Sequence, residues 1–408
     1  MKLLKWIHLI QENCRKSKNN CCKISLASGK IHGLRYFSNR FNVNYKNKTN
    51  HKLITPWIQS LLQSGSVIVS KVDNIYDNLA LEEWLYQNYD FSVNNEQILL
   101  LWYNRPAVVV GRHQNVWLEA SIDYCNRNGI DVARRNSGGG SVYHDMNNLN
   151  ISFITSRKCY DRSRNLQFIK DVLIDNFKIN VDISPRKDLV IRNGGEKISG
   201  TASKLNNHNS YHHCTLLVDV DKGNLRNALR LQPIKNVYSN ATKSVPSPTI
   251  NLKSLKHSVT MGSLIQAISN SYSKYYTANK DRISSVHLLN QIDSKRFGSI
   301  NEIRSRFQSW EWIFGSTPKF TICSEFSDQS INYEMRIIIE KGYIQHVSVE
   351  PNLINENNIL QSNLIGKVRF EQKDLEQAFE TIKINSVGNQ IIAKILLAIF
   401  ASYKQICN

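Results

Sequence analysis

The stretch that decides the fold runs from residue 134 to residue 153 and reads Arg-Arg-Asn-Ser-Gly-Gly-Gly-Ser-Val-Tyr-His-Asp-Met-Asn-Asn-Leu-Asn-Ile-Ser-Phe. Three consecutive glycines, Gly138 to Gly140, lie between two arginines and a His-Asp pair. Glycine lets a backbone approach a ligand closely, and successive N–H groups in such a loop form a concavity that binds anions. Arg134 or Arg135 can add charge-assisted hydrogen bonds. The sequence therefore predicts a glycine loop that holds an anionic ligand.

The residues after the glycines exclude two familiar phosphate-binding motifs. Ser141-Val-Tyr143 is β-prone, so the loop runs into a strand. A Rossmann or Walker glycine motif opens a helix instead, and a Walker loop ends in Gly-Lys-Ser/Thr, which is missing here. Taken alone, the glycines are also compatible with a tight turn between strands, flanked by two surface arginines.

A second segment identifies the kind of ligand. Residues 196–219 contain Glu-Lys-Ile-Ser-Gly-Thr-Ala-Ser-Lys, a polar loop, and then Tyr-His-His-Cys-Thr-Leu-Leu-Val-Asp. The pairing of Arg-Arg-x-Ser-Gly-Gly-Gly-x-Val-x-His-Asp with Lys-Ile-Ser-Gly-Thr-Ala and His-His-x-Thr-Leu-Leu, in this order, resembles the lipoate-protein ligase and lipoyltransferase family. The resemblance extends from about Ser66 to the C-terminus. It is closest to the animal mitochondrial lipoyltransferases, through residues 142–146, Cys214 and residues 309–320.

The resemblance implies an α/β (α+β) architecture. We expect a catalytic domain of the biotin/lipoate-protein ligase type over residues 66–290, with a mixed β-sheet flanked by helices. A smaller C-terminal α/β accessory domain is expected over residues 291–408, because the polar, weakly periodic stretch 279–309 suggests a boundary near residue 290. The apolar patterns predict helices at 74–89, 166–178, 224–231, 261–276, 375–379 and 388–403, and strands at 66–70, 98–103, 107–111, 131–135, 141–143, 148–155, 189–191, 197–203, 211–220, 320–323, 333–339 and 343–349.

The net charge of +19 is concentrated in the first part of the 408-residue chain. Residues 1–65 hold twelve Lys and Arg but one acid, a balance of +11, whereas the remainder holds 40 basic and 32 acidic residues, a balance of +8. A basic, acid-poor start is typical of a mitochondrial transit peptide, and a disordered basic tail is the alternative. We predict a transit peptide over residues 1–37, cleaved after Phe37, an extended linker over residues 38–65, and a place in the mitochondrial matrix.

The eight cysteines include no Cys-x-x-Cys pair, which fits a reduced compartment better than a disulfide framework or a zinc module. No apolar run reaches the roughly 18 residues that a membrane helix needs, so we expect no membrane partner. A basic nucleic-acid-binding protein is a further alternative. The charge lies mostly in a removable segment, however, and no RNA-recognition or zinc-finger pattern is present.

By resemblance, the chain is an acyltransferase. It is expected to move the lipoyl group of lipoyl-AMP to the ε-amine of a lysine on the lipoyl domains of 2-oxoacid dehydrogenase E2 subunits, which makes an amide and AMP. A lipoylated carrier such as glycine-cleavage H protein is a second candidate donor. A full lipoate-protein ligase, which would also use ATP and magnesium, shares every motif. We expect a monomer and an acidic acceptor domain.

The family motif assigns the central role to Lys197, which would hold the lipoyl carbonyl and the AMP phosphate. Losing such a donor should cost ~3 kcal/mol in the transition state, or about 100-fold in rate. Gly140 and Ser141 should offer backbone N–H groups, and Tyr143 can pack against the adenylate. By resemblance, the residues that bind lipoyl-AMP are Arg135, Gly140, Ser141, Val142, Tyr143, Arg186, Lys197, Thr215, Val245 and Ser247.

Several neighbouring residues leave alternatives open. Asp188 could orient Lys197, meet magnesium if ATP is used, or cap a strand. The pairs His144-Asp145 and His212-His213 invite a metal, but adjacent side chains in a strand point to opposite faces. We therefore predict no metal site, with one histidine of each pair in the pocket and the other packed in the sheet.

Two residues replace glycines of the broader family. Asn147 tolerates left-handed backbone angles better than most residues, so the turn could survive with some strain. Cys214 raises the alternative of a thioester intermediate.

Overall fold

The computed structural model describes residues 58, 61, 65–88, 91, 97–230, 234–278, 285–385 and 389–407. The chain divides into two compact units, Met1–Ile54 and Thr55–Asn408, and all described residues belong to the second unit. The predicted transit peptide and nearly all of the predicted linker lie outside the described residues.

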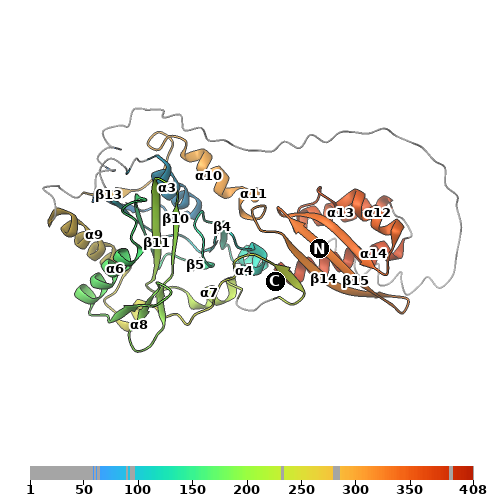
Figure 1. Ribbon diagram of the computed structural model, residues 1–408, viewed down its shortest axis with the longest axis horizontal. Helices are drawn as coiled ribbons and strands as arrows, with labels where there is room; N and C mark the ends of the chain where they lie inside the picture. Colours follow the sequence, from blue (N-terminus) through green and yellow to red (C-terminus); the bar gives the residue numbers. More distant parts are fainter. Residues whose placement is uncertain are drawn as a thin grey trace. The chain divides into compact units, whose positions relative to one another are not determined.

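A six-stranded mixed sheet forms the centre of the catalytic part (Figure 1). Strand β1, next to one edge of the sheet, pairs in parallel with both β2 and β13, and the remaining pairs are antiparallel. The strand order is β10 (Thr201–Leu205), β11 (Asn209–Leu217), β6 (Asn148–Ser156), β2 (Gln97–Trp102), β1 (Val67–Ser70) and β13 (Val286–Leu289).

Helices cover both faces of this sheet. Helices α6 (Arg162–Phe177) and α9 (Met261–Ala278) pack on one face, and α3 (Ile75–Asn88) with α10 (Ile300–Gln308) lies on the other (Figure 1). Side chains alternate between the faces along each strand, so both faces of a central strand are buried. The cluster under α6 and α9 includes Val67, Leu99, Leu101, Ile151, Phe153, Leu166, Ile169 and Tyr272.

Two small three-stranded sheets carry the predicted motifs. The glycine loop joins two strands of the sheet β4 (Asp131–Arg134), β3 (Ala107–Val110) and β5 (Val142–His144). The other sheet contains β7 (Val181–Ile183), β8 (Leu189–Ile191) and β9 (Lys197–Ser199), where β8 and β9 pair as a hairpin. Short helices surround them: α4 (Val116–Glu119), α5 (Ile122–Arg127), α7 (Lys222–Ala228), α8 (Leu252–Leu255) and α11 (Trp310–Ile313).

The C-terminal part is a four-stranded sheet with three helices. Helix α14, 18 residues long, is apolar enough to cross a membrane by length and composition, but half of it is buried within the protein, as in a core helix. It packs against β14, and its buried side includes Ile395 and Ile399. The elements are β12 (Val237–Ser239), β14 (Phe320–Asp328), β15 (Ile331–Glu340), β16 (Tyr343–Glu350), α12 (Ile354–Leu364), α13 (Gln372–Asn385) and α14 (Gln390–Cys407).

One expectation about the strands was wrong. The predicted strand 197–203 is two strands in different sheets, divided at Gly200, whose N–H donates to Thr215 Oγ1 at 3.0 Å. The polar stretch 279–309, for which no element was predicted, contains β13 and α10, and α10 packs on α3. In addition, β12 lies before residue 290 in sequence but pairs with β14. The division near residue 290 stays a prediction.

Candidate functional site

Two adjoining cavities, of about 300 and 840 Å³, open beside the glycine loop. Both volumes fall in the range of small-molecule sites, roughly 300–1,000 Å³. The smaller cavity reaches the central sheet, where Trp102 and His213 line it, and His144 of β5 also borders it. The two cavities share the walls formed by Ser141, Val142, Lys197, Gly200, Thr215 and residues 242–245.

The structure brings all ten predicted binding residues to these cavities. Tyr143 and Ser247 line only the larger cavity, whereas Arg135, Gly140 and Arg186 line only the smaller one. The other five line both: Ser141, Val142, Lys197, Thr215 and Val245.

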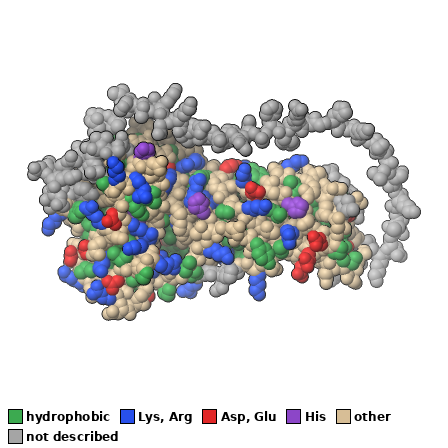
Figure 2. Space-filling model, in the orientation of Figure 1, with side chains coloured by type: hydrophobic (Ala, Val, Ile, Leu, Met, Phe, Trp, Pro, Cys, Tyr) green, Lys and Arg blue, Asp and Glu red, His purple; other side chains and the backbone are tan. Residues whose placement is uncertain are grey.

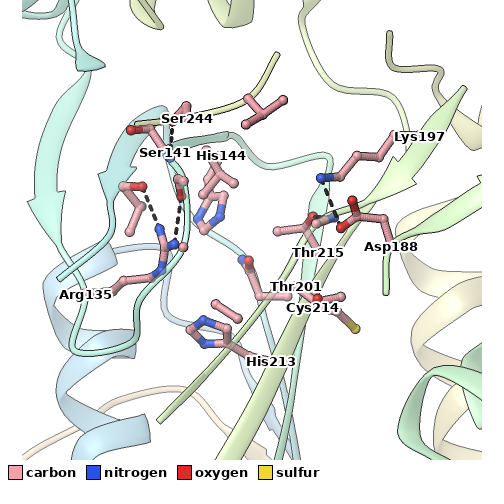
Figure 3. A pocket seen from close by; sticks show the side chains of 18 of the residues that line it. Arg135, Ser141, His144, Asp188, Lys197, Thr201, His213, Cys214, Thr215 and Ser244 are labelled. Atoms are coloured by element: carbon pink, nitrogen blue, oxygen red, sulfur yellow. Dashed lines mark hydrogen bonds and ion pairs between the residues drawn. The ribbon is translucent and has the colours of Figure 1, made fainter. Parts of the chain in front are cut away.

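Lys197 stands at the junction of the two cavities, at the start of β9 (Figure 3). Its Nζ lies 3.1 Å from Asp188 Oδ1, and its side chain is one quarter exposed. The backbone is fixed as well, because the Lys197 N–H donates to the Pro248 carbonyl at 2.9 Å. A Cβ at Gly200 would lie 3.6 Å from Lys197 Nζ, an ordinary contact, so Gly200 borders the lysine closely. Asp188 therefore orients Lys197, which was one of the alternatives predicted for it.

Arg135 is buried and holds the glycine loop (Figure 3). Its Nη2 donates to the carbonyls of Gly138 at 2.6 Å and Gly140 at 2.7 Å, and its Nη1 donates to the Val109 carbonyl at 3.0 Å. Burial lowers the pKa of Arg135 to about 10, so the guanidinium is charged at neutral pH. Arg135 therefore positions the loop, and because it also lines the smaller cavity, its contact with an anion stays a prediction.

A relay of hydrogen bonds continues from Arg135 to helix α3. Arg135 Nε donates to Ser137 Oγ at 2.9 Å, and Ser137 Oγ lies 2.9 Å from His213 Nε2. His213 Nδ1 lies 2.9 Å from the Glu82 carboxylate, so Nδ1 carries the proton and Nε2 accepts from the serine hydroxyl. The floor of the smaller cavity is thus tied to the glycine loop.

Arg134 is fully buried, and its guanidinium also donates to groups of the protein itself. It donates to the carbonyls of Trp312 and Ile313 and to Thr317 Oγ1, which docks α11 against β4. Desolvation by burial lowers the pKa of Arg134 to about 9. Arg134 therefore has no donor left for a ligand, which corrects the expectation for this arginine.

The loop backbone differs from its prediction at one position. Ser141 N–H donates to Ser244 Oγ at 2.8 Å, so this donor is already used. Within the described residues, Gly140 N–H has no acceptor and stays available at the wall of the smaller cavity. Gly139 needs to be glycine because its φ is +87°, and Gly111 must be glycine because a Cβ there would lie 2.1 Å from the Gly139 carbonyl oxygen.

Of the two adjacent histidines 212 and 213, one faces the smaller cavity and the other packs in the sheet, as predicted. His144 and His213 line the smaller cavity, and burial lowers the pKa of His144 to about 3. His212 is stacked on Phe153 within the sheet, with ring centroids 6.0 Å apart, and burial lowers its pKa as well. Asp145 accepts the backbone N–H groups of residues 147 and 221. Among the described residues, no group of three His, Cys, Asp or Glu side chains could hold a metal.

The two residues that replace family glycines are accommodated without a special role. Asn147 is absent from the described residues with a positive φ, so the expected strain does not arise. Cys214 belongs to the hydrophobic core cluster, and its sulfur is turned away from the centre of the cavity (Figure 3). Burial raises the pKa of Cys214 to about 12, which leaves almost no thiolate for a thioester.

Two polar residues near the junction, Gln114 and Glu119, carried no signal in the sequence, whereas Ser244 belongs to the segment of the predicted binding residues Val245 and Ser247. Gln114, Glu119 and Ser244 form one hydrogen-bond network with Ser141. Glu119 is 125 positions from Ser244, and no short motif joins residues that are so far apart. Only the fold reveals this network.

The residues of this site agree with comparisons to known proteins. The model of the lipoyl protein ligase A/B catalytic domain matches residues 74–273. The human lipoyl amidotransferase LIPT1, mitochondrial, is 38% identical over 316 residues, which cover 75% of this chain and 82% of the human protein. The chain belongs to the lipoyl protein ligase A/B family.

Other members of the family give the same result. A putative lipoate-protein ligase A of Schizosaccharomyces pombe is 34% identical, and the match covers 69% of this chain and 79% of the yeast protein. The crystal structure of P. falciparum LipL1 in complex with lipoate superposes with a TM-score of 0.55 at 27% identity, over 81% of this chain and 99% of that structure. The predicted family, fold class and enzymatic class, an acyltransferase of lipoyl groups, are confirmed.

Proposed function

We propose that this chain transfers a lipoyl group from lipoyl-AMP to the ε-amine of a lysine on the lipoyl domains of 2-oxoacid dehydrogenase E2 subunits. The observation that carries the proposal is the position of Lys197, whose charged end meets both cavities beside Asp188. The human relative is a mitochondrial lipoyl amidotransferase, which supports lipoyl transfer and a mitochondrial location, and we place the chain in the matrix.

The charges of the larger cavity suit the nucleotide. Five basic side chains and one acidic side chain, Glu119, line it: Lys197, Lys222, Arg226, Arg230 and Lys243. Such a lining attracts an anionic phosphate. Tyr143 supplies an aromatic wall, and the smaller cavity with Trp102 and Val109 suits the lipoyl chain.

The reaction then requires little from the protein except positioning and charge. The acceptor amine attacks the acyl carbonyl, a C–N bond forms, and the bond from the carbonyl carbon to the phosphate oxygen breaks, so that AMP leaves with the electron pair. The amine loses its proton to solvent. Lys197 stabilises negative charge on the carbonyl and phosphate oxygens, and such preorganised donors supply much of an enzyme's rate enhancement.

The acceptor domain is proposed to present an acidic surface. Lys and Arg side chains are spread across the visible face of the described residues, with Asp and Glu among them (Figure 2). The part of the chain from residue 66 onward has eight more basic than acidic residues, 40 against 32. Complementary charge would speed the encounter between enzyme and acceptor.

A lipoylated carrier such as glycine-cleavage H protein is a second candidate donor.

The test supplies purified protein with an apo lipoyl domain and synthetic lipoyl-AMP, and compares Lys197→Ala with the wild type. Transfer that falls about 100-fold or more in the variant would support the proposal. Transfer that is equal in both would contradict the role of Lys197. A parallel reaction with lipoate, ATP and magnesium tests a full ligase, which is suggested by relatives named lipoate-protein ligase.

A further inference from the structure

A buried carboxylate, Glu119, lies where the two cavities meet. It belongs to the short helix α4, lines the larger cavity and is 6% exposed. Its Oε1 accepts the Ser244 N–H at 3.1 Å, and its Oε2 accepts the hydroxyls of Ser244 and, at 2.9 Å, Ser141. Within the described part of the chain, no Lys or Arg forms an ion pair with it. Its charge is therefore satisfied by donors from two separate segments.

These segments are the glycine loop, through Ser141, and the stretch 242–248, which we call the strap. The strap contains no helix or strand, and most of its residues are exposed, including Val245 at 59%. Its ends are fixed by Thr242 N–H, which donates to His113 O, and by Pro248 O, which accepts from Lys197 N–H. Among the described residues, Ser244 makes the strap's hydrogen bonds between these two ends.

The hydrogen of the Ser244 hydroxyl has one possible direction, whereas the Ser141 hydroxyl can donate either to Gln114 Oε1 at 3.0 Å or to Glu119 Oε2 at 2.9 Å. Ser244 Oγ accepts from Ser141 N–H at 2.8 Å and from Gln114 Nε2 at 3.0 Å, so both of its lone pairs are used. Its single hydrogen must then go to Glu119, which requires an acceptor. Both carboxylate oxygens of Glu119 accept a hydrogen bond from Ser244, one from its N–H and one from its hydroxyl. A glutamine has about the same size, but one of its two terminal groups is NH₂, a donor. Whichever way the amide is turned, this NH₂ group would face one of the two Ser244 donors. Position 119 thus needs a carboxylate rather than merely a polar side chain.

The other side of α4 is anchored firmly. Trp117 packs against Phe320 and Phe370, with ring centroids 5.4 and 5.6 Å apart, and Asn115 caps the helix. The carboxylate of Glu119 is consequently held in place while the strap around it is exposed. A fixed acceptor that binds an exposed segment beside a ligand cavity acts as a latch.

We propose that Glu119 is a positioning residue that latches the strap onto the glycine loop and so retains the activated acyl donor. This inference rests on the proposed function, because Val245 and Ser247 of the strap line the cavity assigned to the nucleotide. Lys197 pairs with Asp188 and not with Glu119. Loss of the latch therefore weakens donor binding and leaves the chemical step largely intact.

The experiment compares full-length wild type with Glu119→Gln, Ser244→Ala and the double variant. Glu311→Gln is the matched control, because this glutamate is exposed and pairs with Arg369. Glu119→Gln should raise the KM for lipoyl-AMP about 10- to 100-fold, with kcat within about threefold of wild type. Ser244→Ala should act similarly, and the double variant should be no worse than either.

A second readout does not depend on activity. Trypsin cleavage after the exposed Lys243 should be faster in Glu119→Gln than in wild type and in the Glu311→Gln control. Equal KM and equal cleavage in wild type and Glu119→Gln would overturn the latch while leaving the proposed function intact. If wild type fails to use lipoyl-AMP, the proposed function fails, and the cleavage rates still decide for or against the latch.

Discussion

Replacement of Arg135 by methionine tests how the glycine loop is held. The guanidinium donates to the carbonyls of Val109, Gly138 and Gly140 and to Ser137 Oγ. Methionine has a similar length but no donors. A buried group left without its partner costs about 1–3 kcal/mol. The two loop carbonyls can turn toward water beside the cavity, whereas the Val109 carbonyl is in β3, so the three together should cost near the lower end of the sum, about 3–5 kcal/mol.

Urea unfolding followed by fluorescence would measure this loss. The displaced loop should also slow transfer from lipoyl-AMP by roughly 100-fold, because small errors of position have large effects on rate. Arg134→Met is the comparison, since this neighbouring buried guanidinium docks α11 through Ile313 and does not touch Gly138 or Gly140. It also donates to the carbonyls of Gly111 and Gln114. Arg134→Met should therefore lose similar stability but a smaller part of its transfer rate than Arg135→Met loses.

The argument would be refuted if Arg135→Met unfolded within about 1 kcal/mol of wild type and still transferred within about threefold of its rate. A loss of stability with normal transfer would show that the hydrogen bonds of Arg135 matter for folding alone. Arg135→Lys should fall between the two, because an ammonium keeps the charge but lacks the planar fork that reaches all four acceptors.

Three further predictions follow from burial and charge. Cys214→Ala should transfer at close to the wild-type rate, and a thioester on Cys214 trapped for mass spectrometry would contradict this. Because His144 is neutral when folded down to a pKa of about 3 while the unfolded residue protonates below about 6.5, its contribution to stability is complete above pH 6.5 and falls as the pH drops toward 3. His144 alone should remove about 2 kcal/mol at about pH 5, and an equally steep pH dependence in His144→Gln would show that other groups are responsible. Transfer to an acidic lipoyl domain should slow as salt rises from about 0.05 to 0.5 M, and salt-independent transfer would exclude electrostatic attraction.

The local motifs were the part of the site that the sequence could predict. The Gly138–Gly140 loop and Lys197 belong to short segments whose residue order reflects one local structure, and the fold brings both to the cavities. Apolar, β-prone runs likewise predicted most central strands, such as β2 and β6, because both of their faces are buried. Short elements such as α4 could not be predicted, because four residues are too few to show a helical periodicity.

The contacts that position the motifs could not be predicted, because their partners are far apart in the sequence. Glu82 is 131 residues from His213, and Glu119 is 125 residues from Ser244. Neither carboxylate differs in its local sequence from a glutamate on a solvated helix face. The pairing of β12 with β14 could not be predicted for the same reason, because Val237 pairs with Ile322, a residue far along the chain.

The two arginines of the motif are not the main source of the positive charge that the two cavities offer to a ligand. Both guanidiniums are buried and donate to protein acceptors, so they fix the shape of the loop and of α11. Two lysines line both cavities, and of these Lys243 is exposed on the strap, whereas Lys197 is held at the junction by Asp188. A carbonyl oxygen in the smaller cavity can therefore be stabilised by Lys197 and by the Gly140 N–H. This division predicts that substitutions of the arginines act through geometry, whereas substitution of Lys197 acts directly on the transition state.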